Sequence, residues 1–79
     1  LDLAVAKCLV GGFAYSGQVC IHAQRLFVEE SVFEEFAEKF VAGVKRLKYG
    51  DPLNPDTEIS VMIDEENAIR VTDWIQEAV

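Results

Sequence analysis

The distribution of apolar residues along the chain predicts three helices and one strand. Residues 1–15 are almost entirely apolar and hold only two charged side chains. A helix that is apolar on nearly every side belongs in the interior of a larger body, so we expect a buried first helix. Gly11 and Gly12 weaken its last turn, and Ser16-Gly17 is its predicted stop.

The clearest periodic pattern lies in residues 31–48. Apolar side chains recur there at spacings of three and four, which places them on one stripe of a helix. The stripe consists of Phe33, Phe36, Ala37, Phe40, Val44 and Leu47. Ser31 and Glu34 form an S-x-x-E capping box at its start. Gly50 supplies the predicted C-terminal stop, followed by a turn at Asp51-Pro52.

Two further segments complete the predicted order of helix, turn, strand, helix, loop and helix. Residues 24–29 contain the short apolar run Leu26-Phe27-Val28, which favours a strand covered on both faces. Residues 51–60 have the composition of a loop, and Asp64 is the predicted cap of a last helix. A single strand cannot pair its own backbone groups, so its neighbours are expected outside the chain. The predicted fold class is therefore α/β, as a mainly helical fragment.

Length and composition favour a part of a larger fold. A chain of 79 residues is at most one small domain, and 51% of its residues are apolar, which is more than so small a body can bury. The chain also opens in the middle of the apolar pattern at Leu1, without an initiator Met. We therefore expect a fragment whose apolar surface packs against absent segments or leads it to self-associate.

The charge balance limits the classes of partner. Fourteen acidic residues stand against seven basic ones, for a formal charge of −7. Such a field repels a phosphate backbone, so no nucleic-acid partner is expected. No basic amphipathic face, long apolar run or signal peptide points to a membrane. Cys8 and Cys20 do not make a disulfide framework, which favours reduced thiols and a cytoplasmic location.

One of these thiols has a suggestive local context. The segment Gly17-Gln18-Val19-Cys20 places a cysteine just after a glycine turn that ends a buried helix. A thiol held there can act as a nucleophile if a base or a local dipole favours the thiolate. The backbone N–H of Cys20 can also help to stabilise an oxyanion. On these grounds alone a buried structural cysteine stays the competing interpretation.

A resemblance adds to this reading. The run from Phe13 to Arg25 resembles the active-site signature of the aldehyde dehydrogenase superfamily: a phenylalanine, then G-Q-x-C, then an arginine five residues after the cysteine. The similarity extends through Gly50-Asp51-Pro52 and Met62-Ile63-Asp64, and so covers essentially the whole chain. Family members often carry Gly-Pro where this chain has Ser60-Val61.

The resemblance implies that residues 1–79 are a partial catalytic domain of an NAD(P)-dependent aldehyde dehydrogenase. The Cys20 sulfur would attack the aldehyde carbon, hydride would pass to NAD or NADP, and the resulting thioester would be hydrolysed to the acid. Val19 and Ile21 would line the aldehyde pocket as substrate-binding residues. Gly17 and Gln18 would shape the turn, and Arg25 would anchor the structure beneath the site.

The same resemblance places several functional groups outside the chain. The general-base glutamate, the side-chain amide of the oxyanion hole and the cofactor-binding domain all belong to other segments. No residue here is assigned to cofactor or metal binding, and the fragment alone is expected to be inactive. The parent protein is expected to be a homodimer or homotetramer.

Other interpretations stay open beside the catalytic one. His22, two residues after Cys20, invites a Cys–His dyad or a metal pair, although two ligands fall short of a structural zinc site. Cys8 is expected in the core, and Gly11-Gly12 is no phosphate cradle because it lies inside an apolar helix. Clusters of acidic residues suit helix starts better than a calcium loop. The rival function is an acidic helical interaction module that forms a homodimer without catalysis.

Overall fold

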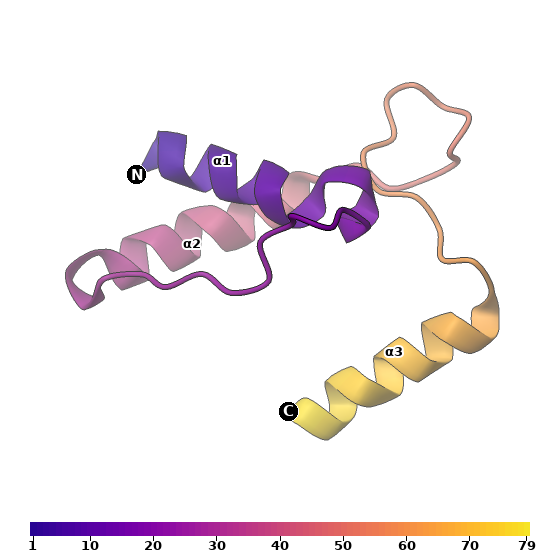
Figure 1. The fold of residues 1–79 in the computed structure, drawn as a ribbon. Coiled ribbons are helices and arrows are strands. Elements are labelled where there is room, and N and C mark those ends of the chain that lie inside the picture. The colour runs from indigo at the N-terminus through magenta and orange to yellow at the C-terminus, as the bar shows by residue number, and fades with distance from the viewer.

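The structure, a computed structural model, describes all 79 residues and is mainly helical, as predicted (Figure 1). The first helix, α1, spans Asp2–Phe13, and a 3-10 helix, η1, follows at Ala14–Gly17. Helix α2 spans Glu30–Arg46 and α3 spans Glu65–Ala78. The two long connections, residues 18–29 and 47–64, carry the segments of interest for function.

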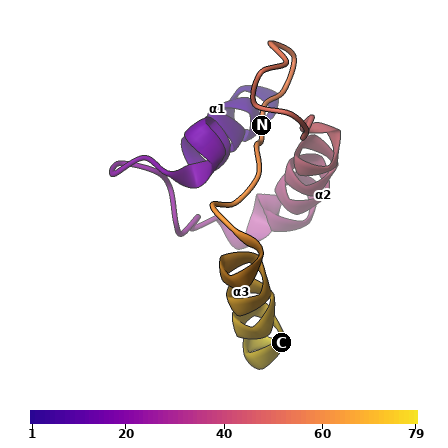
Figure 2. The same ribbon diagram turned by 90° about the vertical axis from the view of Figure 1, so that its right-hand side faces the viewer.

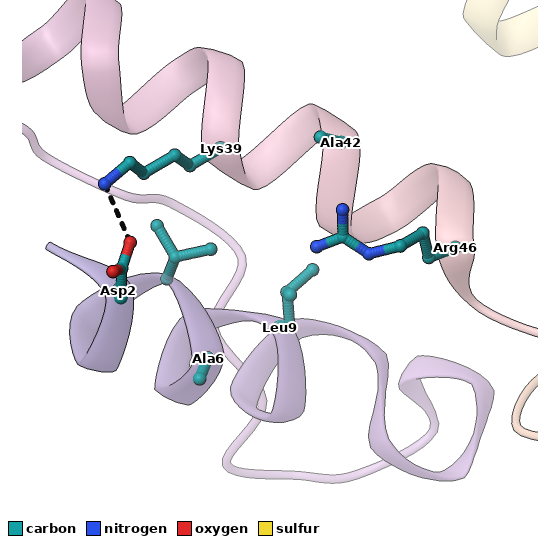
Figure 3. Close-up of a pocket in the computed structure, with 7 residues that line it drawn as sticks. Asp2, Ala6, Leu9, Lys39, Ala42 and Arg46 are labelled. Carbon is teal, nitrogen blue, oxygen red and sulfur yellow. Dashed lines mark hydrogen bonds and ion pairs between the residues drawn. The ribbon is translucent and has the colours of Figure 1, made fainter.

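Helices α1 and α2 lie side by side and run in the same direction, and residues 18–29 lead back from the end of α1 to the start of α2 (Figure 1). At one end, Lys39 Nζ lies 2.7 Å from Asp2 Oδ1 (Figure 3). The same nitrogen lies 2.9 Å from Glu35 Oε1. The hydrogen bond from Lys39 lowers the pKa of Asp2, and the bonds to both carboxylates raise the pKa of Lys39 to about 12. Seven residues after Asp2, the side chain of Leu9 lies against Gly43 of α2.

The core between these helices is small. Val5 of α1 and Phe36 of α2 are its buried apolar side chains, and Gly43 is the third buried residue. The rings of Phe36 and Phe40 stack with centroids 5.7 Å apart. The predicted stripe of α2 therefore does turn toward α1, but most of its members stay partly accessible to solvent.

Both predicted ends of α2 are wrong. The helix begins at Glu30, with Glu29 as the extended cap residue, so Ser31 already lies inside the first turn. The predicted capping box of Ser31 with Glu34 does not form, because a box requires its serine at the cap position. At the other end the helix stops at Arg46, and not near Gly50, because the backbone of Lys48 pairs with the loop at residues 58–59.

The predicted strand is also absent. Residues 24–29 form no regular element, and the Phe27 side chain is 94% exposed. A strand needs a neighbour for its backbone donors and acceptors, and none is present in residues 1–79. The only β-type pairing is a single parallel bridge between Tyr49 and Ile59. The α/β class predicted from the sequence is thus not seen in this chain, whereas its helical character is.

Helix α3 stands apart from the other two (Figures 1 and 2). Its predicted cap is confirmed, since Asp64 accepts hydrogen bonds from the backbone N and side-chain Nδ2 of Asn67 at 2.8 and 2.7 Å. These bonds lower the pKa of Asp64. The apolar side of the helix is uncovered, with Trp74 58% exposed and its ring 4.9 Å from the Arg70 guanidinium carbon. The expectation of excess apolar surface is therefore met most clearly on α3.

Candidate functional site

The chain reverses sharply between α1 and the cysteine turn. Tyr15 and Ser16 have φ values of 55° and 56°, and Gly17 follows at 82°. This left-handed region costs roughly 1–2 kcal/mol for a residue with a side chain, and glycine adopts it freely. Gly17 is therefore the one position of the three that suits its backbone. Helix α1 ends at Phe13, before the predicted stop at Ser16-Gly17, and the chain reverses over these three residues.

Cys20 lies on the turn that follows, at the surface. Its side chain is exposed, whereas Cys8 on α1 is half-buried. The turn closes through the carbonyl of Val19, which accepts bonds from the backbone N of His22 at 3.0 Å and from His22 Nδ1 at 2.7 Å. The thiol is thus carried on a short closed turn at the surface of the chain.

His22 does not form a dyad with Cys20. No hydrogen bond joins the His22 ring to the thiol, because Nδ1 is engaged by the Val19 carbonyl. A carbonyl oxygen only accepts, so Nδ1 must carry the proton. In the neutral ring this leaves Nε2 without a proton. The role of the ring here is to close the turn through its hydrogen bond to the Val19 carbonyl.

The cysteine turn is fastened back onto the end of α1. The backbone N of Ala23 donates to the carbonyl of Gly11 at 2.8 Å. A Cβ added to Gly17 would lie 3.6 Å from the carbonyl oxygen of Gly12. The glycine pair of α1 therefore provides a bare stretch of helix against which the returning chain packs. The sequence excluded a phosphate-binding role for this pair but did not reveal its contact with the turn.

The other predicted site residues are not gathered around the thiol. Val19 is half-buried, whereas the Ile21 side chain is 87% exposed. Arg25 is exposed and makes no ion pair or side-chain hydrogen bond. The predicted aldehyde pocket at Val19 and Ile21 is consequently not enclosed by residues 1–79.

A hollow of about 450 Å³ does lie beside the preceding turn. It is lined by Tyr15, Ser16 and Gln18 together with Pro52, Thr57, Glu58, Ser60 and Val61. Within it the backbone N of Ser60 donates to Ser16 Oγ at 3.1 Å. The loop after α2 thus reaches the turn that precedes Cys20, a contact that no local sequence signal indicated.

No part of the chain gathers ligands for a metal ion. No three His, Cys, Asp or Glu side chains lie together as metal ligands. Gly11 and Gly12 sit inside α1 and pack against Ala23, so they offer no phosphate-binding turn. No residue of this chain is therefore assigned to a cofactor. None of the helices has the length and apolar character needed to cross a bilayer.

Comparison with known proteins gives one consistent result. The model of the aldehyde dehydrogenase family matches residues 1–79. A lactaldehyde dehydrogenase of Methanococcus aeolicus is 43% identical over 100% of the chain and 17% of its own length. A putative aldehyde-dehydrogenase-like protein of Sinorhizobium fredii is 41% identical over 99% of the chain and 15% of its length.

An NADP(+) succinate-semialdehyde dehydrogenase of Mycobacterium leprae is 37% identical, again over 99% of the chain and 17% of its own length. The chain thus spans about a sixth of the length of the curated relatives that it matches. No solved structure matches it.

Proposed function

This chain belongs to the aldehyde dehydrogenase family, and we propose that Cys20 is the nucleophile with which the full-length protein oxidises an aldehyde to a carboxylic acid. The observation that carries the proposal is the position of Cys20 within the G-Q-x-C motif, exposed on a turn. Bonds from His22 to the Val19 carbonyl close this turn, and the bond from Ala23 to Gly11 attaches it to α1. Cys8, the other thiol, lies half-buried on α1 and is assigned to packing.

The chemistry assigned to this chain is the formation of one bond. The Cys20 thiolate donates its electron pair to the aldehyde carbon, and the carbonyl π electrons move to the oxygen, which becomes an alkoxide. The backbone N–H of Cys20 is the group in this chain assigned to the developing oxyanion. Sulfur suits the role because it adds readily to a carbonyl and later departs as a stable thiolate.

The oxidation itself is assigned to NAD or NADP, which accepts a hydride when bound elsewhere in the full-length protein. No residue of this chain is assigned to the cofactor, so no step assigned to residues 1–79 runs through it. The base that activates water for thioester hydrolysis is likewise assigned to another segment. A chain of residues 1–79 alone is therefore expected to form no NADH or NADPH from any aldehyde.

Val19 and Ile21 are proposed as walls of the aldehyde pocket. They flank Cys20, and both side chains are apolar. Val19 is half-buried and Ile21 is exposed. Apolar side chains without covering neighbours are the surface that other segments of a larger protein would complete. The names of the relatives mention lactaldehyde and succinate semialdehyde, both small aldehydes, and a small aldehyde is the proposed substrate class.

An interaction module would use exposed apolar surface to bind its partner. A segment that spans a sixth of a larger enzyme also exposes apolar surface, because the segments that cover it are not part of the chain. The family match therefore favours the catalytic function over the rival.

In the full-length protein we propose that the uncovered faces of α3 and residues 24–29 pack against further segments, with residues 24–29 paired there as a strand. The proposed assembly is a homodimer or homotetramer in a reducing, cytoplasmic setting that keeps Cys20 a thiol.

The test is the rate of NADH or NADPH formation by the full-length protein with small aldehydes. Cys20→Ser is expected to reduce the rate to background, because a serine alkoxide is not available at neutral pH without a dedicated base. Cys8→Ser is the matched control, since it makes the same change at the half-buried thiol, and it should retain most of the activity. Full activity of Cys20→Ser would refute the proposal.

A further inference from the structure

We propose that Ser16 is a positioning residue, which holds the nucleophile turn in place through its hydrogen bond with the loop after α2. The inference rests on the proposed function of Cys20 and deepens it. The bond joins Ser16 Oγ to the backbone N of Ser60 at 3.1 Å, across 44 residues of chain. No other side-chain hydrogen bond connects the segment before Cys20 to the loop after α2.

The Ser16 end of this bond lies in the least regular backbone of the chain. Two consecutive residues with side chains, Tyr15 and Ser16, are held at positive φ. Such a conformation persists only where the surroundings fix it. One local bond, from the N of Gln18 to the carbonyl of Tyr15 at 3.1 Å, closes the turn from within. The bond from Ser60 is the contact that fixes it from outside.

The Ser60 end lies on a loop that backbone hydrogen bonds close. The carbonyl of Lys48 accepts bonds from the N of Glu58 at 2.7 Å and of Ile59 at 3.0 Å, and the N of Lys48 donates to the Glu58 carboxylate at 3.0 Å. The N of Gly50 donates to the carbonyl of Ile59 at 3.2 Å. These bonds bring the two ends of the loop together directly after α2, so the donor at Ser60 is fixed relative to that helix.

The bond therefore completes a closed circuit. Helix α1 packs on α2, α2 leads into the closed loop, the loop holds Ser16, and Ser16 lies four residues before Cys20. Without it, the turn is attached only through α1 and the bond between Ala23 and Gly11. Misplacement of a reacting group by about 1 Å can cost on the order of a hundredfold in rate, so a brace on this turn bears directly on catalysis.

Both partners of the bond can be removed separately in the full-length protein. Ser16→Ala removes the acceptor, and Ser60→Pro removes the donor N–H. Ser60→Ala is the matched control, because it keeps the N–H and changes only the side chain. Ser16→Gly also removes the acceptor but relaxes the left-handed backbone, so it separates the hydrogen bond from the strain.

The expected result is a fall in kcat of about tenfold for Ser16→Ala, with KM for the aldehyde unchanged within about twofold. Ser16→Gly should lose as much as Ser16→Ala, and Ser60→Ala should match the wild type. The double variant Ser16→Ala/Ser60→Pro should be no slower than Ser16→Ala alone, because both changes break one bond.

Wild-type kcat in Ser16→Ala would overturn the proposal, and so would a fall that is matched by Ser60→Ala or restored by Ser16→Gly. If Ser60→Pro fails to fold, Ser16→Ala, Ser16→Gly and Ser60→Ala still decide the matter. The Cys20→Ser variant distinguishes a failure of the proposed function from a failure of the proposed role of Ser16. An active Cys20→Ser removes the proposed function itself, whereas an inactive Cys20→Ser beside a fully active Ser16→Ala removes only the brace.

Discussion

The side chain of Leu9 on α1 occupies the space beside Gly43 on α2 in which any other residue would place its Cβ. Of the five glycines, Gly43 is the one at which an added Cβ would clash with a neighbouring side chain. Gly43 is also one of three buried residues. The absence of a side chain at position 43 is therefore what allows α1 to lie against α2, and it sets where the turn that carries Cys20 leaves the pair.

A first prediction concerns this contact. Gly43→Val should overpack the interface and separate α1 from α2, at a cost of about 1–3 kcal/mol. Hydrogen exchange of residues 2–13 in the full-length protein should then accelerate by about tenfold or more. Glu38→Val, which places the same side chain at an exposed position of α2, is the control and should leave that exchange unchanged. Equal exchange in both variants would contradict the packing described here.

A second prediction concerns the reversal at Gly17. Gly17→Ala should destabilise the turn by roughly 1–2 kcal/mol, because φ is 82° there and alanine disfavours the left-handed region. Gly12→Ala is the matched control: its Cβ would lie 3.8 Å from the Ala23 carbonyl oxygen, an ordinary contact. The thermal midpoint and the rate of aldehyde oxidation by the full-length protein should both fall for Gly17→Ala. Equal behaviour of the two variants would show that backbone conformation at Gly17 is unimportant.

A third prediction concerns pH and the start of α3. The bonds from Asn67 lower the pKa of Asp64 below its ordinary value of 3.8. Since the folded-state pKa is the lower one, the stabilisation by this cap is fully present above pH 3.8 and is lost as the pH falls through the lowered value. The amide resonance of Asn67 should therefore titrate with a midpoint below 3.8. Asp64→Asn, which keeps an acceptor but no titrating group, should abolish this titration. A midpoint at or above 3.8 would contradict the cap.

A fourth prediction concerns the chain of residues 1–79 by itself. Ile69, Trp74 and Ile75 are each more than half exposed on α3, and no other helix covers them. Sedimentation of the isolated chain should therefore depend on concentration, because exposed apolar surface drives self-association. Ile75→Lys should weaken that association. A monomer at all concentrations, with a sharp cooperative melting transition, would count against this account.

Local signals predicted the parts of the fold that local physics determines. The spacing that joins Phe36 to Phe40 gave α2, and the carboxylate of Asp64 gave the start of α3, because each depends on residues within one or two helical turns. The capping box failed at Ser31 because Glu29 takes the cap position instead. The helix ended before Gly50 because contacts with residues 58–59 outcompete its continuation.

The sequence predicted only those parts of the candidate site that are formed by residues adjacent in the chain. The glycine turn and the exposed thiol at Cys20 follow from one continuous segment. The clip between His22 and the Val19 carbonyl requires the actual path of the turn, and the bond between Ser16 and Ser60 joins positions 44 residues apart. The strand predicted at residues 24–29 is absent, because residues 1–79 supply no neighbouring strand for it to pair with.

The most direct test of the account is the relation between the alkylation of Cys20 and activity. The full-length protein would be treated with iodoacetamide for increasing times, the modified fraction of each cysteine measured by peptide mass spectrometry, and aldehyde oxidation assayed in the same samples. If Cys20 is the nucleophile, activity falls in proportion to the modified fraction of Cys20 and does not follow that of Cys8. Undiminished aldehyde oxidation by protein whose Cys20 is fully alkylated would contradict it.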